Sequence, residues 1–207
     1  MKILNCVLDS YDAIFFDLDG TLINSMPLHN QAWIDTFKEN NVEVPLQFFF
    51  ETAGMSSLRI VEIINERHGL QLNPEEVSRV KRDKYLIHLN QVEVVEKVIE
   101  IVKEYYGKRP LGIITGGSHE VVDQLLPKLG IDKYFDTVIC SDDTKIGKDG
   151  KEPYLLATKN LNVTPEKSLF FDDGDVGLKG ALSTGMDVIH VDVEDKKVFM
   201  GFKKARD

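Results

Sequence analysis

Cysteine is scarce in this 207-residue sequence, in which only Cys6 and Cys140 occur. Two cysteines cannot build a disulfide framework, so we expect a protein of a reducing compartment, the cytoplasm, with Cys140 buried and structural. No apolar run approaches the roughly 18 residues that a membrane-spanning helix requires. Residues 1–10 contain a single lysine and an aspartate, which is not the pattern of a secretory signal peptide. We therefore expect no membrane partner.

Positive charge is also in deficit. The 25 Lys and Arg residues are outnumbered by 34 Asp and Glu residues, which leaves a formal net charge of −9 at pH 7. A surface of this sign repels phosphate backbones, so we expect no nucleic-acid partner. A small phosphate ester is not excluded, because it responds to the local field and to any bound metal. Mutual repulsion between acidic surfaces also favours a monomer.

The most informative stretch of the sequence is a short apolar segment that ends in two acids. Residues 13–16 read Ala-Ile-Phe-Phe, and Asp17-Leu18-Asp19-Gly20-Thr21-Leu22 follows. Four apolar residues in a row predict a buried strand that delivers Asp17 at its C-terminal end. Gly20 permits the sharp turn by which the chain leaves the sheet. Carboxylates this close repel each other, which favours either a hard cation such as Mg²⁺ between them or a solvated Asp-x-Asp-Gly turn.

The segment from residue 26 to residue 90 has a helical pattern and contains no buried-strand pattern. His29, Trp33 and Phe37 recur at i+4 spacing, which places them on one helix face. Asn73 followed by proline and two glutamates is typical of a helix start. We predict three or four consecutive helices with the phenylalanines at 48–50 in their shared core. Three of them cover 26–40, 56–68 and 73–89, and Ser56 or Ser57 is the expected N-cap of the second.

After residue 91 strands and helices alternate. This order implies right-handed crossovers and a parallel sheet covered by helices on both faces. We therefore predict a Rossmann-like α/β core formed by residues 1–25 and 91–207, with an all-helical insertion at 26–90. The tail from residue 192 has no clear period and is expected to form a short helix at most. Strands are predicted at 110–115, 137–140, 168–171 and 187–191, and helices at 94–107, 116–129, 152–161 and 175–184.

Polar residues follow several of the predicted strands. The strand ends carry Asp17 and Asp19, then Thr115, then Asp172 and Asp173. Ligands of parallel sheets gather beyond the C-terminal strand ends, so we expect these groups to meet in one crevice. The Asp172-Asp173 pair taken alone is also a plausible helix N-cap. Four acids together are too negative to stay together without a divalent cation, which predicts a Mg²⁺ site.

The first motif resembles that of the haloacid dehalogenase superfamily. The order of motifs over residues 11–191 is similar to that of the subfamily that contains β-phosphoglucomutase and related sugar phosphatases, where a helical cap follows the first motif. The resemblance implies a parallel-sheet core with the segment 26–90 as the cap. It also implies a Mg²⁺ cofactor and a small phosphorylated metabolite as the substrate.

The same resemblance implies roles for the strand-end residues. Asp17 corresponds to the nucleophile that accepts the phosphoryl group, and Asp19 to the general acid and base that also offers its backbone carbonyl to the metal. Asp173 corresponds to a direct metal ligand and Asp172 to the acid beside it. Phosphoryl-oxygen binding falls to the Thr115 hydroxyl and the Gly116 amide.

The third motif departs from the family pattern, because relatives carry Lys-Pro-x-Pro and both prolines are replaced here. Alignment on the Tyr-Leu-Leu-Ala sequence at 154–157 places the motif lysine at Lys148. Lys151 is the alternative, and either lysine could otherwise be a solvated loop residue.

The predicted cap contains the expected specificity residues. His29 corresponds to a cap-entry histidine, with Trp33 one turn later, although this spacing also suits simple packing. Gly54 and Met55 belong to the loop that faces the sugar in relatives. By the same resemblance, Ser57 corresponds to an arginine that binds the second phosphate of the substrate in the mutase. A serine cannot bind a phosphate in that bidentate manner. Lys81 or Arg59 could compensate.

The absent arginine favours a phosphatase, because a mutase must bind both phosphates of a bisphosphate intermediate. The leading hypothesis is a Mg²⁺-dependent phosphatase that hydrolyses a small sugar phosphate through an aspartyl-phosphate intermediate. Fructose 1-phosphate and 6-phosphogluconate are the nearest substrates by resemblance. A β-phosphoglucomutase and a catalytically silent phosphate-binding protein remain as alternatives.

Overall fold

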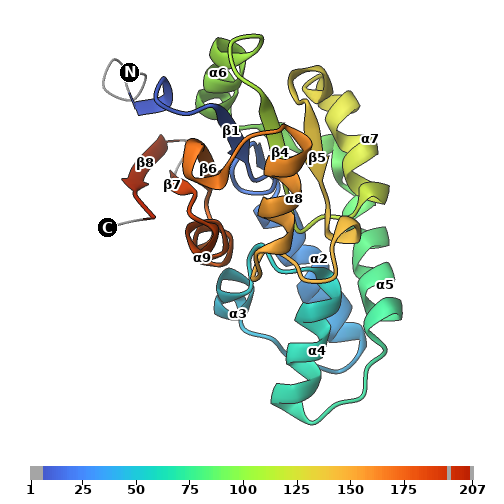
Figure 1. Ribbon diagram of the computed structural model, residues 1–207. Helices are drawn as coiled ribbons and strands as arrows, with labels where there is room; N and C mark the ends of the chain where they lie inside the picture. Colours follow the sequence, from blue (N-terminus) through green and yellow to red (C-terminus); the bar gives the residue numbers. More distant parts are fainter. Residues whose placement is uncertain (1–6, 195–196, 206–207) are drawn as a thin grey trace.

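The structure is a computed structural model that describes residues 7–194 and 197–205 (Figure 1). Its main feature is a six-stranded sheet with the strand order β5-β4-β1-β6-β7-β8. Strands β5 to β7 of this order run parallel, and β8 pairs antiparallel with β7. The strands are β1 (Ala13–Phe16), β4 (Leu111–Ile114), β5 (Thr137–Ile139), β6 (Ser168–Asp172), β7 (Asp187–Glu194) and β8 (Lys197–Lys203).

Helices cover both faces of the sheet, as predicted. Strand β1 shows why, because its residues alternate between two hydrophobic clusters. Ile14 and Phe16 pack with residues of α6 and α7, and Ala13 and Phe15 pack with residues of α8 and α9. All four side chains are fully buried. The helices are α6 (Glu96–Tyr105), α7 (His119–Leu129), α8 (Glu152–Asn160) and α9 (Asp175–Thr184).

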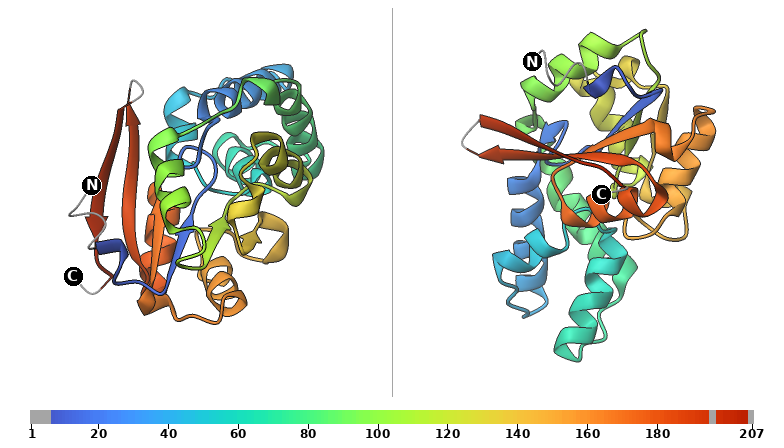
Figure 2. Two further views of the ribbon diagram at one scale, coloured as in Figure 1. Left: turned by 90° about the horizontal axis from the view of Figure 1, so that it is seen from above. Right: turned by 60° about the vertical axis from the view of Figure 1, so that its left-hand side comes forward.

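The segment after β1 forms the predicted helices, which extend beyond the sheet (Figures 1 and 2). They surround a third hydrophobic cluster that includes Trp33, Phe37 and Phe49. Ser56 caps α4 by accepting a hydrogen bond from the Arg59 amide. The helices are α2 (Met26–Glu39), α3 (Leu46–Glu51), α4 (Ser57–His68) and α5 (Pro74–Ile87), and Asn73 caps α5 as expected.

A short antiparallel ribbon joins the entry and exit of this helical segment. Strand β2 (Ile23–Asn24) pairs with β3 (Glu93–Val94), so the two chain crossings lie side by side. The sequence did not predict this ribbon, because two-residue strands have no detectable period.

Two predictions about the fold are wrong. Phe50 is 56% exposed, whereas Phe48 and Phe49 are buried. Three consecutive residues on a helix span more than half a turn, so they cannot all face one core. The C-terminal tail forms β8 and not a helix, because residues 197–203 pair with seven residues of an extended β7. A distant partner determines this edge strand, and local periodicity does not report it.

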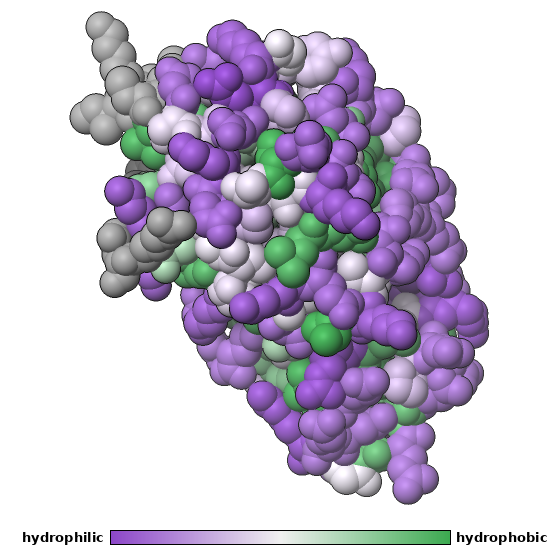
Figure 3. Space-filling model, viewed as in Figure 1, coloured by the Kyte–Doolittle hydropathy of each residue, from purple (hydrophilic) through white to green (hydrophobic). Residues whose placement is uncertain are grey.

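The surface seen in Figure 3 is largely hydrophilic, with hydrophobic residues confined to small separate patches. Within residues 7–194 and 197–205, none of the helices combines the length and apolar character needed to cross a bilayer. Cys140 is buried as expected. Cys6 and most of residues 1–10, which lack the pattern of a signal peptide, lie outside the described residues.

Candidate active site

A cavity of about 570 Å³ lies where the helical segment meets the C-terminal ends of the parallel strands. The sheet side contributes Asp17, Asp19, Thr115 and Gly116 to its lining. The helical side contributes predicted residues from three elements and their loops: His29, Trp33, Gly54, Met55, Ser57 and Lys81. The structure thus brings the predicted cap residues and the first two motifs to one cavity.

Strand register places the acids beside each other. Phe16 pairs with Phe171 of β6, so Asp17 and Asp172 leave neighbouring strands at the same level. The chain then turns at Gly20, whose φ is +89°. A β-carbon at this position would overlap the carboxylate of Asp173. Gly20 therefore serves both the turn and the close approach of this acid.

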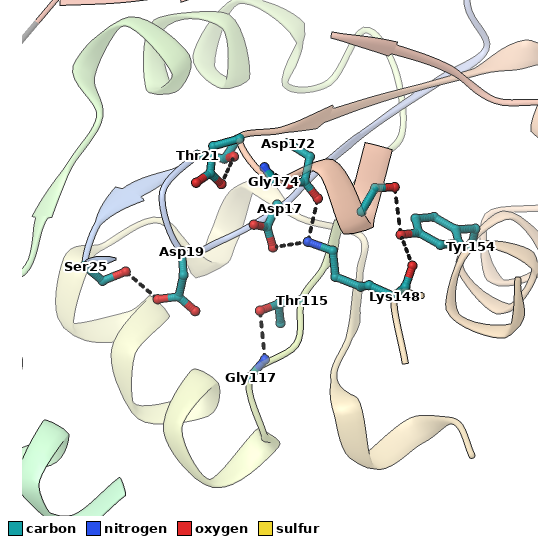
Figure 4. A network of polar contacts seen from close by, with 12 residues as sticks. Asp17, Asp19, Thr21, Ser25, Thr115, Gly117, Lys148, Tyr154, Asp172 and Gly174 are labelled. Atoms are coloured by element: carbon teal, nitrogen blue, oxygen red, sulfur yellow. Dashed lines mark hydrogen bonds and ion pairs between the residues drawn. The ribbon is translucent and has the colours of Figure 1, made fainter. Parts of the chain in front are cut away.

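Lys148 connects the buried acids (Figure 4). Its Nζ lies 2.8 Å from Asp17 Oδ1 and 2.5 Å from Asp172 Oδ2, and all three side chains are at most 5% exposed. Burial disfavours the charged ammonium, but the two carboxylates hold the pKa of Lys148 above its usual value. Lys151 is exposed. Of the two candidate lysines, Lys148 is the one that contacts the acids.

The cluster still holds more negative charge than one lysine offsets. Burial raises the pKa of Asp17 well above its ordinary value; Lys148 opposes this shift, and Asp172 and Asp173 add to it. Burial and the Asp172 carboxylate likewise raise the pKa of Asp173 to about 7. Excess negative charge in a buried place is the condition that a bound cation relieves.

The donor set suits a hard divalent cation. Oxygen atoms of Asp17, Asp172 and Asp173 lie within 4.8 Å of one another. Carboxylate oxygens are the ligands that Mg²⁺ prefers. Thr21 fixes Asp173 by donating a hydrogen bond of 3.2 Å to its Oδ1. The side chain of Asp19 lies outside this group, so only its backbone carbonyl remains as the predicted ligand.

The carboxylate of Asp19 instead joins a chain of polar contacts toward the helical segment. Its Oδ1 accepts hydrogen bonds from Ser25 Oγ at 2.5 Å and from His29 Nε2 at 2.9 Å. Lys81 Nζ lies 2.5 Å from His29 Nδ1, and this contact favours the tautomer with hydrogen on Nε2. Burial alone would raise the pKa of Asp19, but His29 and Ser25 hold it near 2.

Burial lowers the pKa of Lys81 to about 8, although Asp19 partly opposes this shift. Burial and the nearby ammonium of Lys81 also lower the pKa of His29. At neutral pH these shifts favour an ionised Asp19 and an uncharged imidazole.

The loop after β4 lies directly against the helical segment. Thr115 Oγ1 accepts a hydrogen bond of 3.0 Å from the Gly117 amide. A β-carbon on Gly116 would come within 2.6 Å of the Gly54 carbonyl oxygen. Only a glycine permits this approach between the sheet side and the helical side of the cavity.

Trp33 and Arg59, the two remaining residues predicted for the cavity, lie in different surroundings from each other. Trp33 is buried, its ring stacks on Phe37 at 5.2 Å between centroids, and Lys81 Nζ lies 5.2 Å from the indole centroid. Arg59 pairs with Glu62 and Glu66 of its own helix and does not line the cavity. Of Lys81 and Arg59, Lys81 is therefore the basic residue that lines the cavity.

The comparisons with known proteins agree with this geometry. The model of the haloacid dehalogenase-like hydrolases matches residues 11–185. The chain belongs to this family. Fructose-1-phosphate phosphatase YqaB of Escherichia coli (strain K12) is 29% identical over 184 residues, which are 88% of this chain and 97% of that protein. The 6-phosphogluconate phosphatase of the same strain is 25% identical over 182 residues, 86% of this chain and 81% of that protein.

A solved structure of β-phosphoglucomutase from Clostridium difficile superposes with a TM-score of 0.76 and covers 87% of this chain and 84% of its own. At 20% identity this likeness shows the fold alone. The predicted resemblance to the haloacid dehalogenase superfamily is confirmed. Because it belongs to this hydrolase family and has phosphatases among its relatives, the chain is a phosphoric monoester hydrolase.

Sequence reasoning missed several residues around this hydrolase site. Ser25 contacts Asp19, and its place just before α2 was the available signal. Arg82 lines the cavity and pairs with Glu120 of α7 at 3.0 Å between Nη1 and Oε2. In the sequence, Arg82 follows Ser78 by four positions, which places both residues on one face of the helix, and Ser78 also lines the cavity. The partner on α7 could not be inferred, because 38 positions separate the pair in the printed sequence.

Proposed function

We propose that this hydrolase is a Mg²⁺-dependent phosphatase that hydrolyses a small sugar phosphate through an aspartyl-phosphate on Asp17. One observation carries the proposal. Asp17 lines the cavity and is paired with a buried lysine beside two further acids, while the Asp19 carboxylate contacts His29 of the helical segment. This arrangement separates a nucleophile and charge-stabilising groups from a proton-transfer group.

In the first half-reaction a carboxylate oxygen of Asp17 attacks phosphorus, and the sugar oxygen leaves. Lys148, the Thr115 hydroxyl and the Gly116 amide stabilise the charge on the transferring group. Asp172 and Asp173, with Asp17 and the Asp19 carbonyl, would hold Mg²⁺, which when bound offsets the charge of the acids and of the phosphoryl oxygens.

Asp19 divides its work between the two half-reactions. An arriving phosphate ester adds negative charge beside Asp19 and raises its pKa, so that Asp19 takes up a proton from solvent and then delivers it to the leaving sugar oxygen. In the second half-reaction the ionised Asp19 accepts a proton from the water that attacks the aspartyl-phosphate. His29 and Lys81 position Asp19 from the helical segment.

We propose that residues 26–90 act as a cap domain on a core formed by 1–25 and 91–207. His29, Trp33, Gly54, Met55 and Ser57 then face the sugar and exclude water from the aspartyl-phosphate. A cavity of about 570 Å³ has the size of sites for small metabolites. The names of the relatives, a fructose-1-phosphate phosphatase and a 6-phosphogluconate phosphatase, support a sugar phosphate as the substrate.

The test is a turnover screen with sugar phosphates, 6-phosphogluconate and β-glucose 1-phosphate that records both free phosphate and isomerised sugar. We expect phosphate release that needs Mg²⁺, stops with EDTA and is lost in Asp17→Asn. Asp12→Asn is the matched control, because Asp12 lies exposed just before the same strand. Isomerisation without release would instead make the enzyme a mutase. Turnover unaffected by Asp17→Asn would overturn the assigned nucleophile.

A further inference from the structure

A second group of metal-binding side chains lies on the α/β core, apart from the acids beside Asp17. His119 is the first residue of α7, Cys140 follows β5, and Asp143 ends the short 3-10 helix η3 (Ser141–Asp143). One donor atom from each of these three side chains lies within 4.8 Å of the others. Helix α7 and strand β5 are neighbours in Figure 1. The group shares no residue with the proposed Mg²⁺ site.

The histidine is oriented as metal-binding histidines are. Its Nε2 lies 2.9 Å from Asp143 Oδ2, and its Nδ1 lies 3.2 Å from Asp123 Oδ1 one turn along α7. A carboxylate on the far ring nitrogen fixes the ring and strengthens the other nitrogen as a ligand. The His119 backbone amide also donates to Asp142 Oδ2 at 3.2 Å, which attaches the start of α7 to η3.

The thiol and the carboxylate are also fixed in place. Cys140 is 1% exposed. Its backbone amide donates a hydrogen bond of 2.8 Å to Asp143 Oδ2, the oxygen that also contacts His119. His119 and Asp143 remain partly exposed, at 37% and 30% of their side-chain surfaces. The group therefore borders solvent through His119 and Asp143, and a water molecule bound from that side would supply a fourth ligand.

The three donors differ in kind, and this mixture selects the class of cation. One imidazole nitrogen, one sulfur and one carboxylate oxygen suit a borderline-soft ion, whereas Mg²⁺ and Ca²⁺ take oxygen ligands. Bond lengths of about 2.0–2.3 Å to a tetrahedral ion imply donor separations of roughly 3.3–3.8 Å. The separation of 2.9 Å between His119 Nε2 and Asp143 Oδ2 needs to widen by only a few tenths of an ångström.

We propose that His119, Cys140 and Asp143 form a second metal site that takes a thiophilic divalent cation of the Zn²⁺ class, with Asp123 orienting the histidine. Binding forms bonds to Nε2, Sγ and a carboxylate oxygen, and the proton on Sγ and any proton on Nε2 pass to solvent. Ion pairing accounts for His119 between two aspartates, and packing in the hydrophobic core accounts for the burial of Cys140. A bound cation is the arrangement that uses all three donors together.

The site lies at the rim of the substrate cavity. Ser118 and Ser141, which adjoin two of the ligands, both line the cavity. The Ser141 amide donates a hydrogen bond of 2.9 Å to the Gly117 carbonyl, beside the proposed phosphate-binding residues. A bound ion would therefore fix η3 and the start of α7 next to the loop after β4.

The test is a Co²⁺ titration of the chelator-treated full chain, followed by absorption spectroscopy. We expect a sulfur-to-cobalt charge-transfer band in the near ultraviolet that Zn²⁺ abolishes at equimolar amounts and millimolar Mg²⁺ leaves intact. Co²⁺ at the acids beside Asp17 cannot give this band, because that group has no sulfur. This readout is independent of enzyme activity and of the proposed function.

Variants assign the ligands. Cys140→Ser should remove the band, whereas the matched variant Cys6→Ser should keep it. His119→Gln, which changes a partly exposed residue, should weaken Zn²⁺ binding at least tenfold, and Asp123→Asn should weaken it about 10- to 100-fold. Circular dichroism checks the fold of each variant. A titration of the unaltered chain without the band, or a band that Cys6→Ser removes and Cys140→Ser keeps, would overturn the proposal.

Discussion

At the scale of single residues, the site depends on a buried lysine between acids. Lys148 contacts Asp17 and Asp172, and its ammonium is the one basic group that the structure places between these carboxylates within the described residues. Buried charges are tolerated only when partners compensate them, so the lysine and the acids depend on each other. This coupling leads to two predictions.

Replacing Lys148 by methionine should destabilise the metal-free protein by about 3–5 kcal/mol, because two buried carboxylates lose their partner. Urea unfolding in EDTA measures this free energy. The matched variant Lys151→Met removes an exposed lysine and should change it by no more than about 0.5 kcal/mol. Equal effects of the two variants would show that Lys148 is not the compensating charge. Mg²⁺ should recover part of the loss.

The raised pKa values predict an unusual pH dependence of stability without metal. Asp173 has a folded pKa of about 7, well above its value in the unfolded chain. The folded state therefore holds the extra proton, and stability falls as pH rises from about 4 to about 7. The pKa of Asp17 is raised as well and acts in the same direction.

The measurement is the unfolding free energy in EDTA from pH 4 to pH 8, for the unaltered protein and for Asp173→Asn. The variant should lose less stability over this range, by at most about 1.4 kcal/mol for each pKa unit. Mg²⁺ should flatten the curve of the unaltered protein, because a cation favours the ionised acids. If the two proteins lost stability equally between pH 4 and pH 8 in EDTA, the raised pKa assigned to Asp173 would be contradicted.

At the scale of elements, one ion pair links the helical segment to the core across the cavity. Arg82 of α5 and Glu120 of α7 lie 3.0 Å apart, with side chains 27% and 54% exposed. Partly exposed pairs contribute roughly 0–1 kcal/mol, which is small for stability and sufficient to bias a closed arrangement.

Glu120→Gln should therefore raise KM for the substrate by up to about fivefold and leave global stability within about 1 kcal/mol. The reason is that a smaller fraction of molecules has the helical segment closed before substrate binds. Steady-state kinetics at constant ionic strength measure the change. Asp83→Asn is the matched control, because it removes a pair with Arg79 inside α5. An unchanged KM in Glu120→Gln would show that the pair does not influence closure.

At the scale of the whole molecule, net charge and surface character favour a single chain in solution. The formal charge is −9, and the face in Figure 3 has no extensive hydrophobic area. Sedimentation velocity at low and at physiological salt should give the mass of one chain at both. A mass of two chains at either salt concentration would contradict this prediction.

The elements with strong local signals were predictable from the order of residues alone. Runs of apolar residues gave the buried strands, the spacing of Trp33 and Phe37 gave an amphipathic helix, and Asn73 gave a cap. It also placed Asp17 and Asp172 at strand ends, and parallel pairing of β1 with β6 then brought them together. These features follow from short-range chemistry, which the order of residues states directly.

The features that depend on distant partners became visible in the folded chain and not before. Strand β8 exists through its pairing with β7, Lys148 is distinguished from Lys151 by its burial between acids, and Arg82 meets Glu120 across the cavity. The juxtaposition of His119, Cys140 and Asp143 is of the same kind. Their physical reason is common: packing of the whole chain sets which polar groups are buried and which side chains meet, and no local pattern contains that information.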